Sequence, residues 1–178
     1  MPRLFAAIEL PEFVRQRLGL LRGEISGAAW VPPENMHLTL RFFGDVSPSV
    51  ADEIDEALAR IEAPSFSLTV RGLAAFGTAQ PSTLYAGIEA SEGLAALQRA
   101  VDRAARQAGV KPEGKPFVPH VTLARMRGGQ ARQVAQFLGD GGHLRFPAFV
   151  VEQFVLMSSR PGMGGGPYGV EAVYPLFL

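Results

Sequence analysis

Two short motifs place histidine and threonine at the same spacing. His37-Leu38-Thr39-Leu40 lies in the first half of the chain, and His120-Val121-Thr122-Leu123 lies in the second half. Because side chains alternate across a β-strand, the histidine and the threonine of each motif should share one face. The aliphatic residues beside them should point to the opposite face, into a core. We therefore predict that each motif presents an imidazole and a hydroxyl together.

This set of groups suits displacement at phosphorus, in which the attacking and leaving oxygens lie on opposite sides. One imidazole can accept a proton from water while the other donates a proton to the leaving oxygen, because histidine titrates near neutral pH. The threonine hydroxyls can donate hydrogen bonds to the non-bridging oxygens, where charge builds up. We predict that His37 and His120 form the acid–base pair and that Thr39 and Thr122 bind the phosphate. The third histidine, His143, has no counterpart and is interpreted as a loop residue.

The composition argues against several other kinds of site. The chain has no cysteine, which excludes a disulfide framework, a thiolate zinc site and a cysteine nucleophile. Two histidines without an acidic cluster beside them are fewer than the three or four ligands that zinc normally takes. The sequence also has no Gly-x-x-x-x-Gly-Lys-[Ser/Thr] loop for nucleotide phosphates. We therefore expect neither a metal nor a cofactor.

The stretches around the two motifs also occur twice. Residues 4–9 resemble residues 84–89, and residues 66–70 resemble residues 146–150, in the same order along the chain as the motifs. This order indicates duplication of a unit of roughly 80 residues. We expect a single domain over 1–178 in which two repeats, approximately 1–80 and 81–178, each form a lobe.

Hydrophobic periodicity predicts a β-α-β-α-β order in each repeat. The predicted strands are 4–8, 36–43 and 66–73 in the first repeat and 83–89, 119–125 and 148–157 in the second, with a last strand at 170–177. The predicted helices are 12–25, 49–61, 92–108 and 130–138, with Ser47-Pro48 and Ser91 as start signals for the second and third. The pattern favours an α+β fold with two lobes related by a pseudo-two-fold axis.

The charge distribution limits the partners that the protein can bind. The net charge is zero, which argues against a protein that coats long nucleic acid, because that affinity grows with the number of phosphate contacts. Basic residues nevertheless concentrate between Arg99 and Arg132, where only Asp102 and Glu113 oppose them. They can bind one or a few phosphates or form ordinary solvated surface.

The apolar run near the N-terminus is interrupted at Glu9, too early for a secretion signal or a membrane span. We expect a soluble cytoplasmic protein that does not contact a membrane. We also expect a monomer, since the duplication supplies within one chain the symmetry that a dimer would otherwise provide.

The paired motifs, together with residues 3–11, 36–46 and 119–125, resemble the 2H phosphoesterase superfamily. Within it, the chain is most similar to the RNA 2′,3′-cyclic phosphodiesterase group, also called the 2′-5′ RNA ligase or ThpR-like family. The resemblance implies a bilobal fold with antiparallel sheets lining a central cleft. It also implies hydrolysis of RNA 2′,3′-cyclic phosphate ends to 2′-phosphate, without a metal or cofactor. By analogy His37 is the proton donor and His120 the proton acceptor, an order that the residues alone leave open.

Several further residues are candidates for substrate binding. Arg125 matches an arginine that the family uses near the phosphate, although alternation puts it on the face opposite His120 unless the strand ends or bulges near Ala124. Phe5 and Tyr85 are repeat partners that could stack on a base or belong to the core. Trp30 is a candidate for the rim of the site.

The same residues also fit three other functions. The same site could act on a small cyclic nucleotide or a cyclic ADP-ribose phosphate. RNA ligation through a 2′-5′ bond would be weak and would be the reverse of cyclic-phosphate chemistry, because no nucleotide-activation motif is present. A non-catalytic module that binds RNA ends would keep phosphate affinity but lose no rate on replacement of His37 or His120.

Overall fold

The computed structural model describes residues 3–77, 79–128, 130–159 and 168–178. The strands are β1 (Arg3–Glu9), β2 (Ala29–Trp30), β3 (His37–Asp45), β4 (Phe66–Leu68), β5 (Val70–Phe76), β6 (Thr83–Ile88), β7 (His120–Arg125), β8 (Phe149–Val151), β9 (Gln153–Ser159) and β10 (Tyr168–Pro175). The helices are α1 (Glu12–Gly19), α2 (Pro48–Ala59), α3 (Glu92–Gln107) and α4 (Ala131–Gly141), with a short 3₁₀ turn, η1, at Pro33–Asn35. The α+β alternation expected from the sequence is confirmed.

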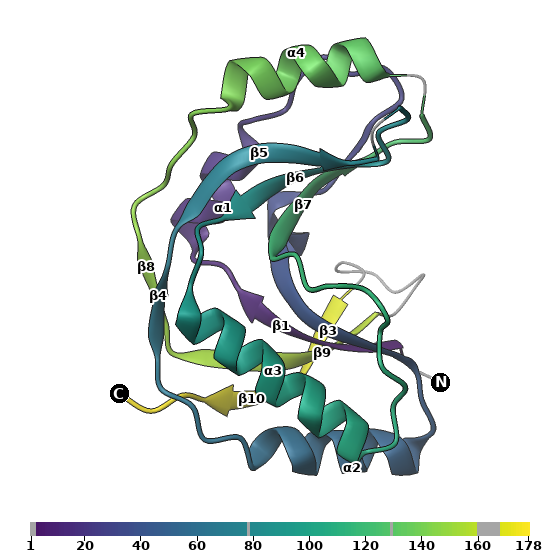
Figure 1. The fold of residues 1–178 in the computed structure, drawn as a ribbon, viewed down its shortest axis with the longest axis vertical. Helices are drawn as coiled ribbons and strands as arrows, with labels where there is room; N and C mark the ends of the chain where they lie inside the picture. Colours follow the sequence, from purple (N-terminus) through teal and green to yellow (C-terminus); the bar gives the residue numbers. More distant parts are fainter. Residues whose placement is uncertain (1–2, 78, 129, 160–167) are drawn as a thin grey trace.

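Most strands form one antiparallel sheet in the order β10-β9-β1-β3-β7-β6-β5, with β2 beside β7. Its two halves, one containing β1 and β3 and the other β6 and β7, are seen one below the other in Figure 1. Within the described residues a single ladder pair, Leu38 with Val121, joins them. These residues hold the same place in the two motifs, so the pseudo-two-fold axis passes through their pair. The bilobal, antiparallel architecture is thus confirmed.

The last strand of each repeat is exchanged between the two halves. The predicted strand 66–73 is divided into β4 and β5, and the predicted strand 148–157 is divided into β8 and β9. β4 pairs with β8, whereas β5 pairs with β6 and β9 pairs with β1. The expectation that residues 1–80 and 81–178 each form one lobe is therefore wrong. The physical reason is that β1 and β6 would each keep an unpaired edge, which the strand from the other repeat covers.

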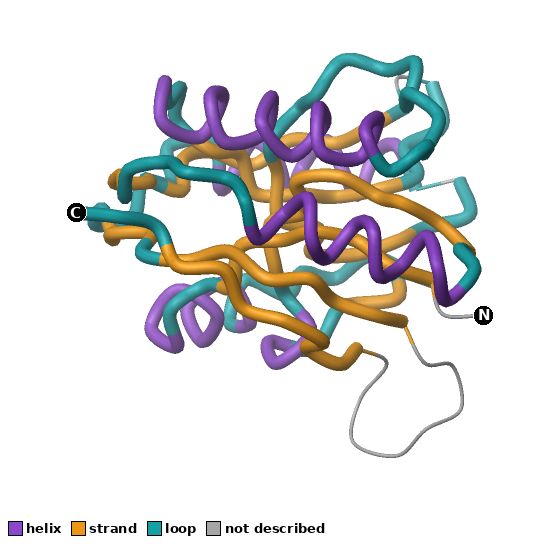
Figure 2. Tube along the Cα trace, turned by 90° about the horizontal axis from the view of Figure 1, so that it is seen from below, coloured by secondary structure: helices purple, strands orange, loops and turns teal. Residues whose placement is uncertain are grey.

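Helices α2 and α3 cover the half of the sheet that contains β3. They pack against each other, and α3 also packs against β3; Figure 2 shows one long helix in front of the strands and another along their upper side. Helix α4 packs against β5 in the other half. The side chain of Ser47 accepts a hydrogen bond from the Val50 amide, and that of Ser91 accepts one from the Leu94 amide, as their capping positions predict.

Helix α1 is shorter than the predicted helix 12–25. It ends at Gly19, where an added Cβ would lie 2.5 Å from Cγ of Pro33. The missing side chain lets the end of α1 approach η1 closely. Leu20, the next residue, is 83% exposed. Leu21 and Ile25, which lie in the rest of the predicted helix, still pack with the core, but from the segment after α1.

Strand β1 is buried on both faces, which explains its continuous apolar run. Leu4, Ala6 and Ile8 belong to the main core, whereas Phe5 and Ala7 form a smaller cluster on the other face with Val155 and Met157. The second cluster supports the face on which the two motifs lie. No helix within the described ranges is long and apolar enough to cross a membrane.

Candidate active site

Each motif strand carries a bulge that turns one more side chain toward the motif face. In β7 the pairing with β6 passes from Thr122 to Ala124 and skips Leu123. Leu123 and Ala124 are therefore both buried, and Arg125 returns to the face of His120 and Thr122. Arg125 was expected to reach the site only if the strand ends or bulges near Ala124, and the structure has this bulge.

The equivalent bulge lies in β3. The pairing with β1 passes from Thr39 to Arg41 and skips Leu40, so that Leu40 and Arg41 are both buried. Phe42 consequently points to the same face as His37. The position that carries Arg125 in the second motif thus carries an aromatic ring in the first.

The four motif residues and Arg125 line one pocket of about 230 Å³. The antiparallel pair of Leu38 with Val121 sets the arrangement. Continued by one residue on each side, this register puts His37 across from Thr122 and Thr39 across from His120. Each imidazole therefore has the hydroxyl of the other motif opposite it, which is a suitable geometry for two proton-transfer groups around one phosphate.

Both imidazoles are held in the same way. Nδ1 of His37 donates a hydrogen bond to the Asn35 carbonyl at 2.9 Å, and Nδ1 of His120 donates one to the Val118 carbonyl at 2.7 Å. Because a carbonyl oxygen only accepts, Nδ1 keeps its proton in both protonation states. The proton that can be exchanged is therefore the one on Nε2 of each ring. The first carbonyl comes from η1, and the second comes from the loop that precedes β7.

Aromatic rings pack beside both histidines. Phe5 stacks on His37 with ring centroids 5.0 Å apart, and Tyr168 meets the same imidazole edge-on at 5.1 Å. Phe76 and Tyr85 meet His120 edge-on at 5.0 and 5.3 Å. Phe5 is only 2% exposed, which leaves little of its ring free to stack on a base. These contacts restrict the rotation of both imidazoles.

The interpretation of Phe5 and Tyr85 as repeat partners is wrong. Phe5 pairs with Phe42 of β3, whereas the residue that pairs with Arg125 of β7 is Thr83. Thr83 is therefore the counterpart of Phe5, two residues before Tyr85. The two-residue shift keeps the same strand face, so sequence similarity could not reveal it.

The electrostatic environment differs between the two histidines. Burial lowers the pKa of His37 from its usual value of 6.5, because it disfavours the charged imidazolium. The hydrogen bond to Asn35 opposes this shift, whereas the charges of Arg125 and His120 lower the pKa further. Arg125 is exposed and has no carboxylate partner among the described residues. Its guanidinium is therefore available to an anion in the pocket.

Two other residues lie outside the pocket. Trp30 packs edge-on against Phe137 of α4 with ring centroids 5.7 Å apart, so its interpretation as a rim residue is wrong. The neighbouring Val31 lines the pocket instead. His143 is exposed in the turn after α4, as expected of a loop residue.

Sequence reasoning missed Phe76 and Tyr168, which both line the pocket. The short connection between β5 and β6 is a signal for a hairpin, and hairpin pairing sets Phe76 opposite Thr83. No comparable signal exists for Tyr168, because β10 has no counterpart in the first repeat. In the part of the chain that the structure describes, no three His, Asp or Glu side chains are grouped as metal ligands.

A model of the 2′-5′ RNA ligase superfamily matches residues 13–162. The chain belongs to this superfamily. A member from Aeropyrum pernix, named RNA 2′,3′-cyclic phosphodiesterase, is 41% identical over 118 residues, 63% of this chain and 67% of that protein. A Thermus thermophilus protein of the same name is 34% identical over 186 residues, 98% of this chain and 90% of its own length.

The superfamily fold extends over the whole chain. The crystal structure of E. coli LigT complexed with 3′-AMP superposes with a TM-score of 0.78 at 25% identity, covering 100% of both chains. The resemblance drawn from the paired motifs is thereby confirmed at the level of family and fold.

Proposed function

We propose that this protein hydrolyses 2′,3′-cyclic phosphate ends of RNA to 2′-phosphate ends, with His37 and His120 as its acid–base pair and without a metal. Cyclic phosphodiesterase activity is supported by the names of the relatives described above. The observation that carries the mechanism is the register at Leu38 and Val121, which brings both imidazoles and both hydroxyls to one pocket.

In the proposed reaction His120 accepts a proton from water as the water oxygen attacks phosphorus. The bond between phosphorus and the ribose O3′ breaks, and His37 donates its Nε2 proton to O3′. The products are a 2′-phosphate and a free 3′-hydroxyl. The lowered pKa of His37 in the free protein favours its neutral form, and the negative charge of a bound phosphate favours protonation again.

Three side chains are assigned to phosphate binding. Thr39 and Thr122 donate hydrogen bonds to the non-bridging oxygens, and Arg125 holds the same group through its guanidinium. Phe5 and Tyr85 are proposed to act behind the histidines, where they restrict imidazole rotation. Ligation of RNA through a 2′-5′ bond would be the same reaction in reverse and weak. The monomeric state stays a prediction.

A small cyclic nucleotide or a cyclic ADP-ribose phosphate is the alternative substrate, because the pocket chemistry is common to all these cyclic phosphates. An RNA-end binding module without catalysis is the alternative outside enzymes. It is distinguished by the effect of replacing the histidines, since binding alone does not require proton transfer.

The test uses a short RNA that ends in a 2′,3′-cyclic phosphate, with EDTA present throughout. Wild type, His37→Ala, His120→Ala and the control His143→Ala are compared, and the product phosphate is located by chromatography against 2′- and 3′-phosphate standards. We expect a 2′-phosphate from the wild type. We expect a loss of roughly 10²–10⁴ in turnover for each motif variant, the scale of acid–base catalysis, and no change for His143→Ala.

Other results would change the proposal in distinct ways. Loss of wild-type activity in EDTA would contradict the metal-free mechanism. Full activity in His37→Ala and His120→Ala would contradict the acid–base assignment. An unaltered RNA end with the wild type would direct the search to small cyclic nucleotides, and binding without turnover of any of them would support the non-catalytic module.

A further inference from the structure

The loop between α3 and β7 (residues 108–119, the α3–β7 loop) supplies the carbonyl that holds one of the two histidines. Its Val118 carbonyl accepts the hydrogen bond from Nδ1 of His120. Residues 111–116 of this loop are all exposed and belong to no helix or strand, whereas Phe117 packs partly against the core. Core packing therefore does not explain how residues 111–116 are held, and polar contacts must hold them.

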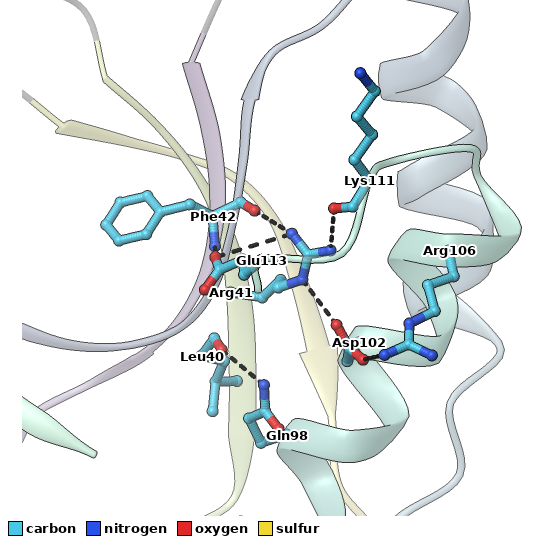
Figure 3. Close-up of polar contacts among 8 residues, drawn as sticks. All are labelled: Leu40, Arg41, Phe42, Gln98, Asp102, Arg106, Lys111 and Glu113. Atoms are coloured by element: carbon cyan, nitrogen blue, oxygen red, sulfur yellow. Dashed lines mark hydrogen bonds and ion pairs between the residues drawn. The ribbon is translucent and has the colours of Figure 1, made fainter. Parts of the chain in front are cut away.

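Arg41 provides these polar contacts, as Figure 3 shows. Its side chain is 2% exposed and donates hydrogen bonds to Asp102 Oδ1 at 2.9 Å and to the carbonyls of Phe42 at 2.6 Å and Lys111 at 2.7 Å. The Phe42 amide donates to Oε1 of Glu113 at 2.9 Å, and Nη1 of Arg41 lies 3.8 Å from the same oxygen. The α3–β7 loop is thus attached to β3 at two points, the Lys111 carbonyl and the Glu113 carboxylate.

Three prolines stiffen the α3–β7 loop around and beyond these points. Pro112, Pro116 and Pro119 each fix their own φ angle, and each restricts the backbone of the residue before it. Val118 precedes Pro119, so its own backbone is among those restricted. The attachment at Glu113 therefore limits the positions that the Val118 carbonyl can take.

The segment before the first motif is held in a different way. Strand β2 pairs with the end of β7, and the Val31 amide donates a hydrogen bond to the Leu123 carbonyl at 2.8 Å. Backbone pairing thus fixes the chain that leads into η1, whose Asn35 carbonyl accepts from His37. The position of His37 consequently depends on a β-ladder rather than on charged side chains.

The corresponding edge of β3 is covered by side chains instead of a strand. Within the described residues one ladder pair joins β3 to β7, and the edge of β3 is open after it. The Leu40 carbonyl, which holds the place of Leu123, accepts a hydrogen bond from Gln98 Nε2 at 3.4 Å (Figure 3). Arg41 and Glu113 cover the groups that follow. In β7 the place of Arg41 is taken by Ala124, which pairs with β2.

We propose that Arg41 is a positioning residue for the reaction: together with Glu113 it holds the α3–β7 loop against β3 and so keeps the Val118 carbonyl where it orients the His120 imidazole. This inference rests on the proposed function, in which His120 is the proton acceptor. The carbonyl keeps the proton on Nδ1, so that Nε2 is the nitrogen left to accept. Loss of the attachment lets the ring rotate and change its tautomer, whereas His37 keeps its own support.

The first test measures the imidazole nitrogen chemical shifts by NMR at a pH at which both rings are neutral. It compares wild type with Arg41→Met, Glu113→Ala and Glu113→Gln, and with Glu53→Ala as a control that removes an exposed carboxylate from α2. In Arg41→Met and Glu113→Ala the two nitrogen shifts of His120 should move toward each other, because the ring gains the second tautomer. The shifts of His37 should not move. Glu113→Gln, which keeps an oxygen for the Phe42 amide, and Glu53→Ala should resemble wild type.

The second test measures kinetics on the RNA with a 2′,3′-cyclic phosphate end. In Glu113→Ala we expect kcat to fall roughly 10- to 100-fold with little change in KM, the scale of a catalytic group displaced by about 1 Å. The same change made in His120→Ala should cause no further loss, because Glu113 acts through His120. Damage to the fold would lower the residual rate in that background as well.

The inference fails if the His120 tautomer is unchanged in Glu113→Ala, or if His37 and His120 change alike. An equal loss of rate in the His120→Ala background would also overturn it. If Arg41→Met does not fold, Glu113→Ala decides, since Arg41 there keeps Asp102 and both carbonyls. If the wild type hydrolyses no cyclic phosphate, the proposed function has failed, but a tautomer change confined to His120 would still support the positioning role of Arg41 and Glu113.

Discussion

The two motifs contain the same residue types, but their surroundings differ in the fifth residue after each histidine. Arg125 brings a guanidinium to the pocket, whereas the equivalent Phe42 brings an aromatic ring. The positive charge lies close enough to His37 to lower its pKa. A duplicated and nearly symmetric set of motifs thus lies in an electrostatically asymmetric pocket.

Replacing Arg125 with methionine should raise the pKa of His37 toward its usual value of 6.5, because one of the charges that lower it is removed. NMR titration of the imidazole measures this pKa directly, with Arg127→Met as a control for the same loss of charge at an exposed position.

The wild type should lose stability as the pH falls below about 6.5, because the unfolded chain then binds more protons than the folded chain at His37. This acid loss should be smaller in Arg125→Met, and an unchanged titration would contradict the electrostatic assignment.

The order of donor and acceptor can be tested with a leaving group that needs no proton. On a phosphodiester that releases p-nitrophenolate, His37→Ala should lose little rate if His37 is the donor. His120→Ala should still lose roughly 10²–10⁴, because water must be deprotonated in either case. The release of p-nitrophenolate is followed by absorbance. The opposite pattern would exchange the two roles.

At the scale of elements, β-bulges in two strands position the site. The bulges in β3 and β7 shift one residue each, so that Phe42 and Arg125 reach the pocket. The bulge in β3 also turns Arg41 into the space beneath α3, where Asp102 meets it. Arg41 thus joins β3, which carries His37, to α3 and to Lys111 in the loop between α3 and His120.

Replacing Asp102 with alanine should therefore weaken the fold. The guanidinium of Arg41 would remain buried with fewer partners, at a cost of about 1–3 kcal/mol in the free energy of unfolding. Arg41 keeps its two carbonyl acceptors, which limits the loss. Urea unfolding measures it, and Asp52→Ala, an exposed change on α2, should stay within about 0.5 kcal/mol of wild type. An equally stable Asp102→Ala would show that the ion pair contributes nothing.

At the scale of the whole molecule, strand exchange couples the two halves of the sheet. β9 completes the half that contains β1, and β5 completes the half that contains β6. Neither half can therefore lose its order without breaking backbone pairs to strands from the other repeat. The pocket, which lies where the halves meet, depends on both at once.

This coupling predicts a single cooperative unfolding unit. In native-state hydrogen exchange, the slowest amides of β1 and of β6 should open with the same free energy, equal to that of global unfolding. Trp30 fluorescence and far-UV circular dichroism should likewise give coincident urea transitions. A half that opened at distinctly lower free energy would show that the exchanged strands do not couple the lobes.

Much of the site follows from local pattern. Alternation in the two motifs places His37 with Thr39 and His120 with Thr122, and this depends only on the geometry of a strand. The start signals at Ser47 and Ser91 act within one helical turn, so they too are readable in the sequence. The duplication indicated that two such sets would face each other.

The tertiary structure decided what depends on a partner far away in the chain. Whether Arg125 faces the pocket depends on the residue of β6 that pairs with it, because a bulge exists only relative to its partner strand. Which strand edges β5 and β9 cover depends on the strand order of the whole sheet. The sequence by itself thus determined which histidine and threonine side chains share a strand face, because that depends on local alternation alone. Long-range backbone pairing decided which neighbours, such as Tyr168 and Phe76, line the pocket with them.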